Sequence, residues 1–308
     1  MPLPSDEKIV SLANDLVTQF VAIFGPHPGF RPAHTKGILL TGTFIPSQEA
    51  AAFTRAPHMN HPSTPVIARF SDSTGIPVIP DNDPNAGPRG FALRFMLGEH
   101  VHTDIVAHST DGFPTHTGAE FLEFLRAIAT GDPSPFLATH PAALAFVQSP
   151  KPAPASFATE AYFGVTAMRF TNADGISHYG RYRIVPGAGI RHLDDAAVKS
   201  KDANYLFDEL TQRLAKEPAI FEIHVQVANP EDTVDDATLH WPENRAVINL
   251  GQVKLTSVAS DNAQEQKKII FDPIPRVEGI DPSDDPLLEL RAAVYLISGR
   301  SRRLAQHA

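Results

Sequence analysis

Residues 221–227 of this chain alternate apolar and polar side chains without a break, with apolar Phe221, Ile223, Val225 and Val227. A period of two places those four side chains on one face of a half-buried β-strand. Other segments have a similar strand-like composition: residues 37–44, 65–71, 90–97, 101–108, 161–170, 178–185 and 250–259. About eight strands are enough to close a barrel around a small ligand or around a packed interior.

Helical periodicity occurs before, between and after these strands. Apolar residues recur at helical spacing from Ile9 to Ile23, which predicts a helix that Ser5 caps and that ends at about Phe24, before Gly25-Pro26. Further helices are expected at residues 119–129, 141–148, 194–216 and near the C-terminus. We therefore expect an α+β fold in a single domain over residues 1–308, an antiparallel eight-stranded β-barrel with helices packed outside.

The composition excludes several classes of function. The formal net charge of -9 gives no electrostatic support for binding nucleic acid. The absence of cysteine excludes disulfides, thiolate metal sites and cysteine nucleophiles. No glycine-rich nucleotide fingerprint is present.

The N-terminal residues 1–8 have no basic start followed by an apolar run, so they do not predict a secretory signal. No stretch approaches the ~18 consecutive apolar residues that a membrane span needs. We expect a cytoplasmic protein without a membrane partner.

Arg291 and Tyr295 are spaced so that a helix brings their side chains together, and Arg302 lies two turns further along the same face. A positive charge close to a phenol favours its ionised form. A phenolate is a hard anionic ligand for ferric iron, so this helix is a candidate source of a proximal haem ligand. The alternative is a basic C-terminal helix with one half-buried tyrosine.

Several islands of sequence, taken together in this order, resemble the haem-dependent catalase family. They are residues 31–37, 42–44, 65–71 and 88–95, followed by Phe271, Asp272, Pro273, Val277, Gly279, Ile280, Ser283, Asp285, Leu288, Arg291 and Tyr295. The resemblance extends over roughly residues 25–305. It implies a catalase-like barrel that ends in a proximal helix, with haem b and its ferric iron as the cofactor.

The resemblance also implies a role for individual residues. Tyr295 would be the axial ligand of the iron, with Arg291 holding its phenol ionised. His34 would be the acid/base on the opposite, distal face, because imidazole titrates near neutrality. Ser71 would orient His34. The alternative for any single histidine among the 14 of this chain is a surface or core position.

Other residues match positions that surround the haem in this family. Arg31, Arg69 and Arg302 would bind its propionates. Phe91 and Phe113 would form apolar walls of the pocket.

The sequence departs from the family pattern at one distal position. Catalases place an asparagine near the distal histidine, and the matching run at residues 104–110 has His108 there, or Ser109 if the alignment shifts by one. The asparagine helps to hold a second peroxide, so its replacement predicts weak catalase activity at most. The imidazole of His108 could still assist cleavage of the O–O bond.

The chain is shorter than typical members of the family. In this it resembles the small catalase-related peroxidase subgroup, and the short length predicts a more open haem pocket. We expect a peroxidase that reduces hydrogen peroxide or organic hydroperoxides with a small organic electron donor. Exposed helical faces would allow a homodimer. The alternatives are a hydroperoxide isomerase resembling allene oxide synthase and a non-enzymatic haem-binding barrel.

Overall fold

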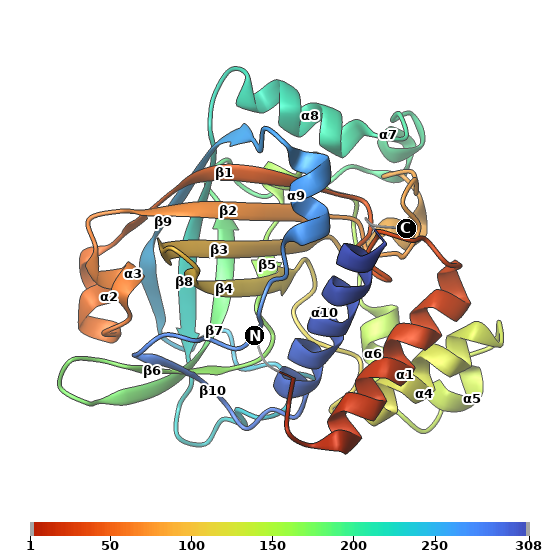
Figure 1. The fold of residues 1–308 in the computed structure, drawn as a ribbon, viewed down its shortest axis with the longest axis horizontal. Coiled ribbons are helices and arrows are strands. Elements are labelled where there is room, and N and C mark those ends of the chain that lie inside the picture. Colours follow the sequence, from red (N-terminus) through yellow and green to blue (C-terminus); the bar gives the residue numbers. More distant parts are fainter. Residues whose placement is uncertain (1–2, 306–308) are drawn as a thin grey trace.

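A computed structural model describes residues 3–305 of the chain, which are arranged around an antiparallel sheet that closes on itself (Figure 1). The ring contains β1 (Gly37–Pro46), β2 (Thr64–Ser71), β3 (Gly90–Gly98), β4 (Val101–His108), β5 (Tyr162–Phe163), β7 (Ser177–Pro186), β8 (Ala219–Val227) and β9 (Val247–Val258). Its order is β7-β5-β4-β3-β2-β1-β9-β8, and pairing of β8 with β7 closes it. The predicted α+β fold with an eight-stranded antiparallel barrel is confirmed.

The barrel has a packed interior. Phe221, Ile223 and Val225 of β8 are fully buried, as their alternation predicts. Phe91 packs against Phe70 and Phe221 with ring centroids 5.0 and 5.4 Å apart. The inside of the barrel is therefore filled by side chains, as is usual for barrels of this size.

The expected strand at residues 161–170 is interrupted. It forms β5 and then β6 (Met168–Thr171), which both lie along β7. Gly164 still donates its N–H to the carbonyl of Tyr182 at 2.9 Å, but the chain then leaves the ladder until Met168. Beyond β6, the sheet adds β10 (Ile280–Pro282), which the sequence did not predict.

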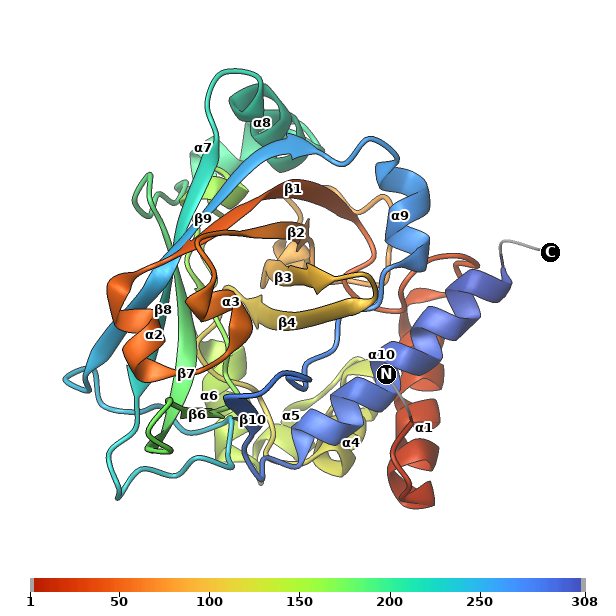
Figure 2. The same cartoon turned by 60° about the vertical axis from the view of Figure 1, so that its left-hand side comes forward.

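The helices cover the outside of the barrel, mostly on one side. Their bounds are α1 (Glu7–Phe24), α2 (Gln48–Phe53), α3 (Pro57–Asn60), α4 (Gly118–Ala129), α5 (Ser134–Leu137), α6 (Pro141–Gln148), α7 (Asp195–Lys199), α8 (Tyr205–Leu214), α9 (Asn262–Lys268) and α10 (Leu287–Leu304), with short 3₁₀ turns at Pro84–Ala86 and Phe157–Thr159. Figures 1 and 2 show α1, α4, α5, α6 and α10 together beside the barrel. Across residues 3–305, none of the helices combines the length and the apolar character that crossing a membrane requires.

Helices α1, α4 and α10 share an apolar core of their own, separate from the barrel interior. Its buried residues are Ala13, Leu16, Leu122, Leu125, Leu290 and Ala293. The molecule therefore has a barrel core and a helical core, and the surface between them is available for a site.

Two helix predictions need correction. The cap of α1 is Asp6, whose carboxylate accepts the N–H of Lys8 at 2.8 Å, and not Ser5. The helix expected at residues 194–216 is two helices, α7 and α8, with turns at residues 200–204 between them. There the carbonyl of Ala203 accepts the N–H of Asp81 at 2.8 Å, a long-range contact that a continuous helix would not allow.

Candidate active site

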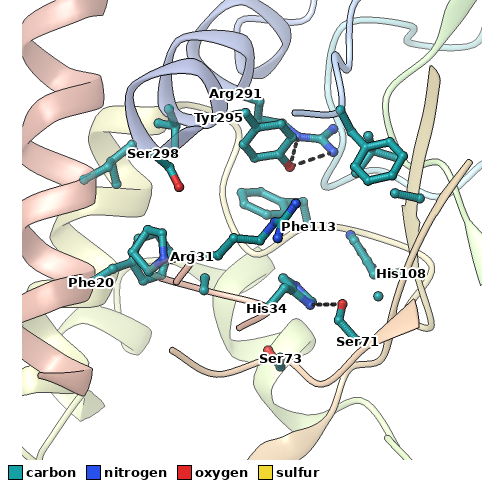
Figure 3. Close-up of a pocket in the computed structure, with 18 of the residues that line it drawn as sticks. Phe20, Arg31, His34, Ser71, Ser73, His108, Phe113, Arg291, Tyr295 and Ser298 are labelled. Atoms are coloured by element: carbon teal, nitrogen blue, oxygen red, sulfur yellow. Dashed lines mark hydrogen bonds between the residues drawn. The ribbon is translucent and has the colours of Figure 1, made fainter. Parts of the chain in front are cut away.

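A cavity of about 400 Å³ lies between the outside of the barrel and the helical core (Figure 3). This volume is within the range of small-molecule sites. All ten site residues predicted from the sequence line it: Arg31, His34, Arg69, Ser71, Phe91, His108, Phe113, Arg291, Tyr295 and Arg302. The structure thus brings together residues from three strands, one helix and two loops.

One side of the cavity, which we call the proximal side, is formed by α10. Arg291 donates from Nε and from Nη2 to the hydroxyl oxygen of Tyr295, at 3.3 Å each. These residues are one helical turn apart, as the sequence predicts. Both donors of the guanidinium point at the phenol oxygen, so the arrangement stabilises negative charge there.

The opposite, distal side carries His34 (Figure 3). Its Nδ1 lies 3.2 Å from Oγ of Ser71. The backbone of His34 has a φ of 52°, in the left-handed region that residues other than glycine rarely adopt. This conformation is held by hydrogen bonds from His34 N–H to the carbonyl of Ser73 (2.8 Å) and from Arg69 to the carbonyl of His34 (2.8 Å).

Strand register gathers the distal residues in one row. Ser71 of β2 pairs with Gly90 of β3, which pairs with His108 of β4. A Cβ atom at position 90 would lie 2.5 Å from Ser71 Oγ and 2.8 Å from His34 Nδ1. The missing side chain of Gly90 therefore makes room for the imidazole of His34 between its neighbours.

Both distal imidazoles are neutral at neutral pH. Burial, followed by repulsion from Arg69, lowers the pKa of His34 to about 4. Burial, followed by repulsion from Arg291 and His34, lowers the pKa of His108 to about 3. A neutral His34 can accept a proton over the whole neutral range.

The structure decides between His108 and Ser109 as the residue at the position of the family's distal asparagine. His108 lines the cavity, and its Nδ1 lies 2.8 Å from Oγ1 of Thr110. Ser109 is outside the lining, and its hydroxyl accepts the N–H of Arg89 at 2.9 Å. The residue that faces the ligand space beside His34 is therefore His108.

Three arginines form a buried cationic cluster at one end of the cavity. Arg31 and Arg302 donate to the carbonyl of Ile269 at 3.0 and 2.9 Å, and Arg69 donates to the side chain of Gln266 at 3.0 Å. None of the ion pairs formed within residues 3–305 includes these arginines, and Nε of Arg302 is buried without a partner.

Burial is the largest cause that lowers the pKa of each arginine in this cluster, to about 9 for Arg69 and about 10 for Arg302. Repulsion adds to it, from other arginines of the cluster for Arg31 and Arg69 and from Arg303 for Arg302. Buried cations without a carboxylate are a binding site for an anionic ligand, because an anion would compensate their desolvation.

The residues present fit a haem. A phenol oxygen supported by a guanidinium is a donor for ferric iron. The apolar walls suit a porphyrin, and the arginine cluster suits its carboxylates.

The sequence did not predict several residues of this pocket. Thr110 and Gln266 support His108 and Arg69 through contacts that no local pattern indicates. The helical core also contributes to the lining, with Leu16, Phe20 and Phe24 of α1 and Phe121, Phe124 and Leu125 of α4. Their helical spacing was visible in the sequence, but spacing alone cannot distinguish a cavity wall from a packed core.

Fold and site together define a class of protein: β-barrels in which a helix carrying a tyrosine faces a distal histidine across a cavity. Comparisons with known proteins agree with this class. The family model described as Catalase matches residues 29–308. The chain is 34% identical over 286 residues to a catalase-related peroxidase of Mycolicibacterium paratuberculosis, covering 90% of each protein. It is 32% identical over 291 residues to a catalase-related peroxidase of Synechococcus elongatus, covering 91% of this chain and 85% of the relative.

Solved structures show the same fold. Catalase A of Saccharomyces cerevisiae superposes with a TM-score of 0.80 at 20% identity, over 90% of this chain and 62% of the yeast chain. A bacterial catalase gives a TM-score of 0.78 at 22% identity, again over 62% of its length. This protein belongs to the catalase family, which confirms the resemblance seen in the sequence.

Proposed function

We propose that this protein is a haem-dependent peroxidase that reduces hydrogen peroxide or organic hydroperoxides with a small organic electron donor. One observation carries the proposal: His34 with Ser71 faces Tyr295 with Arg291 across a single cavity that has buried arginines at one end. The similarity to two catalase-related peroxidases over most of their length supports it.

The cavity residues have distinct roles in holding haem b. Tyr295 would hold the iron through its phenol oxygen, and Arg291 would stabilise the negative charge there through two donors. The guanidinium groups of the arginine cluster would bind the propionates, while Phe91 and Phe113 would form apolar walls of the pocket. When bound, the haem supplies the redox-active iron that receives the oxidising equivalents of the peroxide.

His34 moves the proton. Its neutral ring would accept a proton from one oxygen of a bound peroxide and return it to the other oxygen, which would leave as water. Ser71 holds Nδ1 so that Nε2 is presented to the peroxide. Because the pKa of His34 is lowered to about 4, this base is available throughout the neutral range.

His108 distinguishes this site from one that disproportionates peroxide efficiently. An asparagine amide offers a donor and an acceptor together, whereas a neutral imidazole offers one of each on opposite ring atoms. One of those atoms already contacts Thr110. We infer that a second peroxide is held poorly, so oxygen release is weak compared with oxidation of the organic donor.

The test compares the wild type with Tyr295→Phe after loading with haem. We expect a ferric tyrosinate spectrum in the wild type and its loss in the variant, with hydrogen peroxide driving oxidation of a phenolic donor and little oxygen release. Tyr179→Phe, at a half-buried tyrosine outside the cavity lining, is the matched control and should behave as the wild type.

Other results would point elsewhere. Vigorous oxygen release would mean that His108 replaces the asparagine and that this is an efficient catalase. Conversion of a lipid hydroperoxide without any donor would mean a hydroperoxide isomerase. Haem binding without peroxide cleavage would mean a binding barrel.

A further inference from the structure

Four charged residues form a buried cluster that the proposed reaction does not use. We call Lys36, Asp72, Asp81 and Arg89 the Asp72 cluster. Asp72 directly follows Ser71, and Arg89 directly precedes Gly90, so the cluster adjoins the row of residues that supports His34. The carboxylates of Asp72 and Asp81 have no exposed surface, and the side chain of Arg89 is 4% exposed.

The cluster ties together the two ends of the β2–β3 connection, residues 72–89, and the segment just before β1. Arg89 donates through Nη1 to Oδ1 of Asp72 and to the carbonyl of Ala86, and through Nη2 to the carbonyl of Asp81 at 2.6 Å. Lys36 donates to Oδ1 of Asp81 at 2.5 Å. The two ends of the β2–β3 connection are thereby fixed to each other, and the connection is fixed through Asp81 to Lys36 just before β1, all by buried charges.

The same connection, just after β2, holds the backbone of the distal histidine. The N–H groups of His34 and Thr35 donate to the carbonyls of Ser73 and Thr74, at 2.8 and 3.0 Å. Asp72 itself donates its N–H to the carbonyl of Lys36 at 3.0 Å. His34 has a left-handed backbone, and such a conformation persists only where its surroundings determine it strongly.

The charges of the cluster balance when both acids are ionised, yet Asp72 is poorly satisfied. Its Oδ2 is buried and accepts from no donor among residues 3–305, and Nζ of Lys36 is 4.0 Å away. The charged groups facing Asp72 are Arg89, Asp81 and Lys36. Groups further away that also sense its charge are Arg69, Tyr162 and Tyr205.

From this geometry we propose that Asp72 and Arg89 are positioning residues for His34, and that ionised Asp72 is required to hold the loop that fixes the imidazole. The proposal rests on the peroxidase function proposed above, because His34 is the base of that reaction.

The proposal predicts an acid limb in the activity profile. Burial, the largest cause, raises the pKa of Asp72 to about 7. The folded protein therefore loses this negative charge as the pH falls through about 7, and regains it as the pH rises. His34 becomes protonated only near its pKa of about 4, so the two groups are separated on the pH scale.

The first experiment measures kcat/KM for hydrogen peroxide with a phenolic donor across the neutral range, in haem-loaded protein. The wild type should lose activity as the pH falls through about 7. Asp72→Asn should be lower than the wild type at high pH by about tenfold or more, the effect of a small misplacement of a catalytic group, and should show no acid limb near pH 7. Its haem spectrum should remain that of the wild type.

Asp232→Asn is the matched control. The carboxylate of Asp232 accepts two hydrogen bonds from Arg245, at 2.7 and 2.8 Å, in a loop outside the cavity lining. Like Asp72→Asn, the control substitution therefore removes a carboxylate that is paired with an arginine. It should keep the wild-type rate and profile. If Asp72→Asn also keeps both, the proposal is overturned.

A second readout needs no haem. In ligand-free protein, the ring resonances of His34, assigned with a His34→Gln variant, should shift with a midpoint near pH 7 in the wild type and not in Asp72→Asn. Resonances that do not move near pH 7 in the wild type would overturn the proposal. If the haem-loaded wild type oxidises no donor, the peroxidase function fails and the ring resonances alone decide the positioning role.

Asp72→Asn leaves Arg89 as an unpaired buried cation and can therefore prevent folding. The double variant Asp72→Asn, Arg89→Gln removes both charges. It should show the same flat profile and the same fixed His34 resonances. A wild-type acid limb in the double variant would overturn the proposal.

Discussion

The proximal and distal sides of the cavity are built in opposite ways. On the proximal side, Tyr295 and Arg291 lie one turn apart on a single helix, and α10 alone determines their relative geometry. On the distal side, His34, Ser71 and His108 come from a loop and two strands. They meet only because β2, β3 and β4 pair in one register, with Gly90 between them.

This difference has physical consequences. A helix turn is a local structure, so the proximal pair needs only that α10 forms and packs. The distal row depends on long-range pairing, on a residue with a left-handed backbone, and on a position without a side chain. We therefore expect the distal side to be the more sensitive to small changes of shape, and the proximal side to be sensitive mainly to changes of chemistry.

The largest effect is expected from His34→Ala. Loss of a general acid/base should lower peroxide-dependent donor oxidation by about 10²–10⁴-fold while haem stays bound, because the haem contacts of the proximal side are unchanged. Steady-state rates and the haem spectrum measure the two effects separately. The matched control is His100→Ala, since His100 also has a left-handed backbone, with a φ of 61°, and lies outside the cavity lining. Loss of haem in His34→Ala would show that the two sides are not independent.

The contrast between the two sides also explains what the sequence could predict. The Arg291–Tyr295 pair and the strand of residues 221–227 are local patterns, and both were predicted correctly. The closed barrel followed from the number of strands, but the interruption of the strand expected at residues 161–170 did not. β5 joins β4 through the single pair His108–Phe163, and the chain then leaves the ladder after Gly164.

The missed features depend on partners that are distant in sequence. The Asp72 cluster joins residues 36, 72, 81 and 89, and no spacing rule connects them. At the break between α7 and α8, the carbonyl of Ala203 accepts the N–H of Asp81, a residue far away in the sequence. The choice between Ser5 and Asp6 as the cap of α1 is a shift of one residue, which periodicity does not resolve.

Arg291→Lys tests the chemistry of the proximal side. Lysine keeps the positive charge but cannot place two donors on one oxygen, as Arg291 does at 3.3 Å each. Haem affinity should fall by about 10–100-fold, the usual cost of losing a group that supports a metal ligand. Titration of the protein with haem measures this. Arg213→Lys is the control, because Arg213 makes a similar two-donor contact with Glu209 on α8. Unchanged affinity in Arg291→Lys would mean that charge alone supports Tyr295.

Gly90→Ala tests the shape of the distal side. The added Cβ would lie 2.5 Å from Ser71 Oγ and 2.8 Å from His34 Nδ1, so one of these groups must move. Donor oxidation should fall by about tenfold, less than on loss of the base itself, with the haem spectrum unchanged. Gly98→Ala on the same strand is the control, because its Cβ would meet only Val101 at 3.8 Å. Full activity in Gly90→Ala would show that the distal row adjusts more easily than its packing suggests.

The smallest effect is expected from Asp6→Ala, which removes the cap of α1. Loss of an N-cap costs about 1 kcal/mol of stability, measured as the shift in denaturant unfolding. Because Ala13 and Leu16 of α1 pack with Leu290 and Ala293 of α10, the change should act on the helical core that carries the proximal pair. Ser5→Ala should leave the stability unchanged, since Asp6 and not Ser5 is the N-cap of α1. In Asp6→Ala, haem should dissociate slightly faster while the rate of donor oxidation per bound haem stays unchanged. A loss of that rate would mean that loosening the helices disturbs His34, so that the distal side depends on the helical core as well as on strand register.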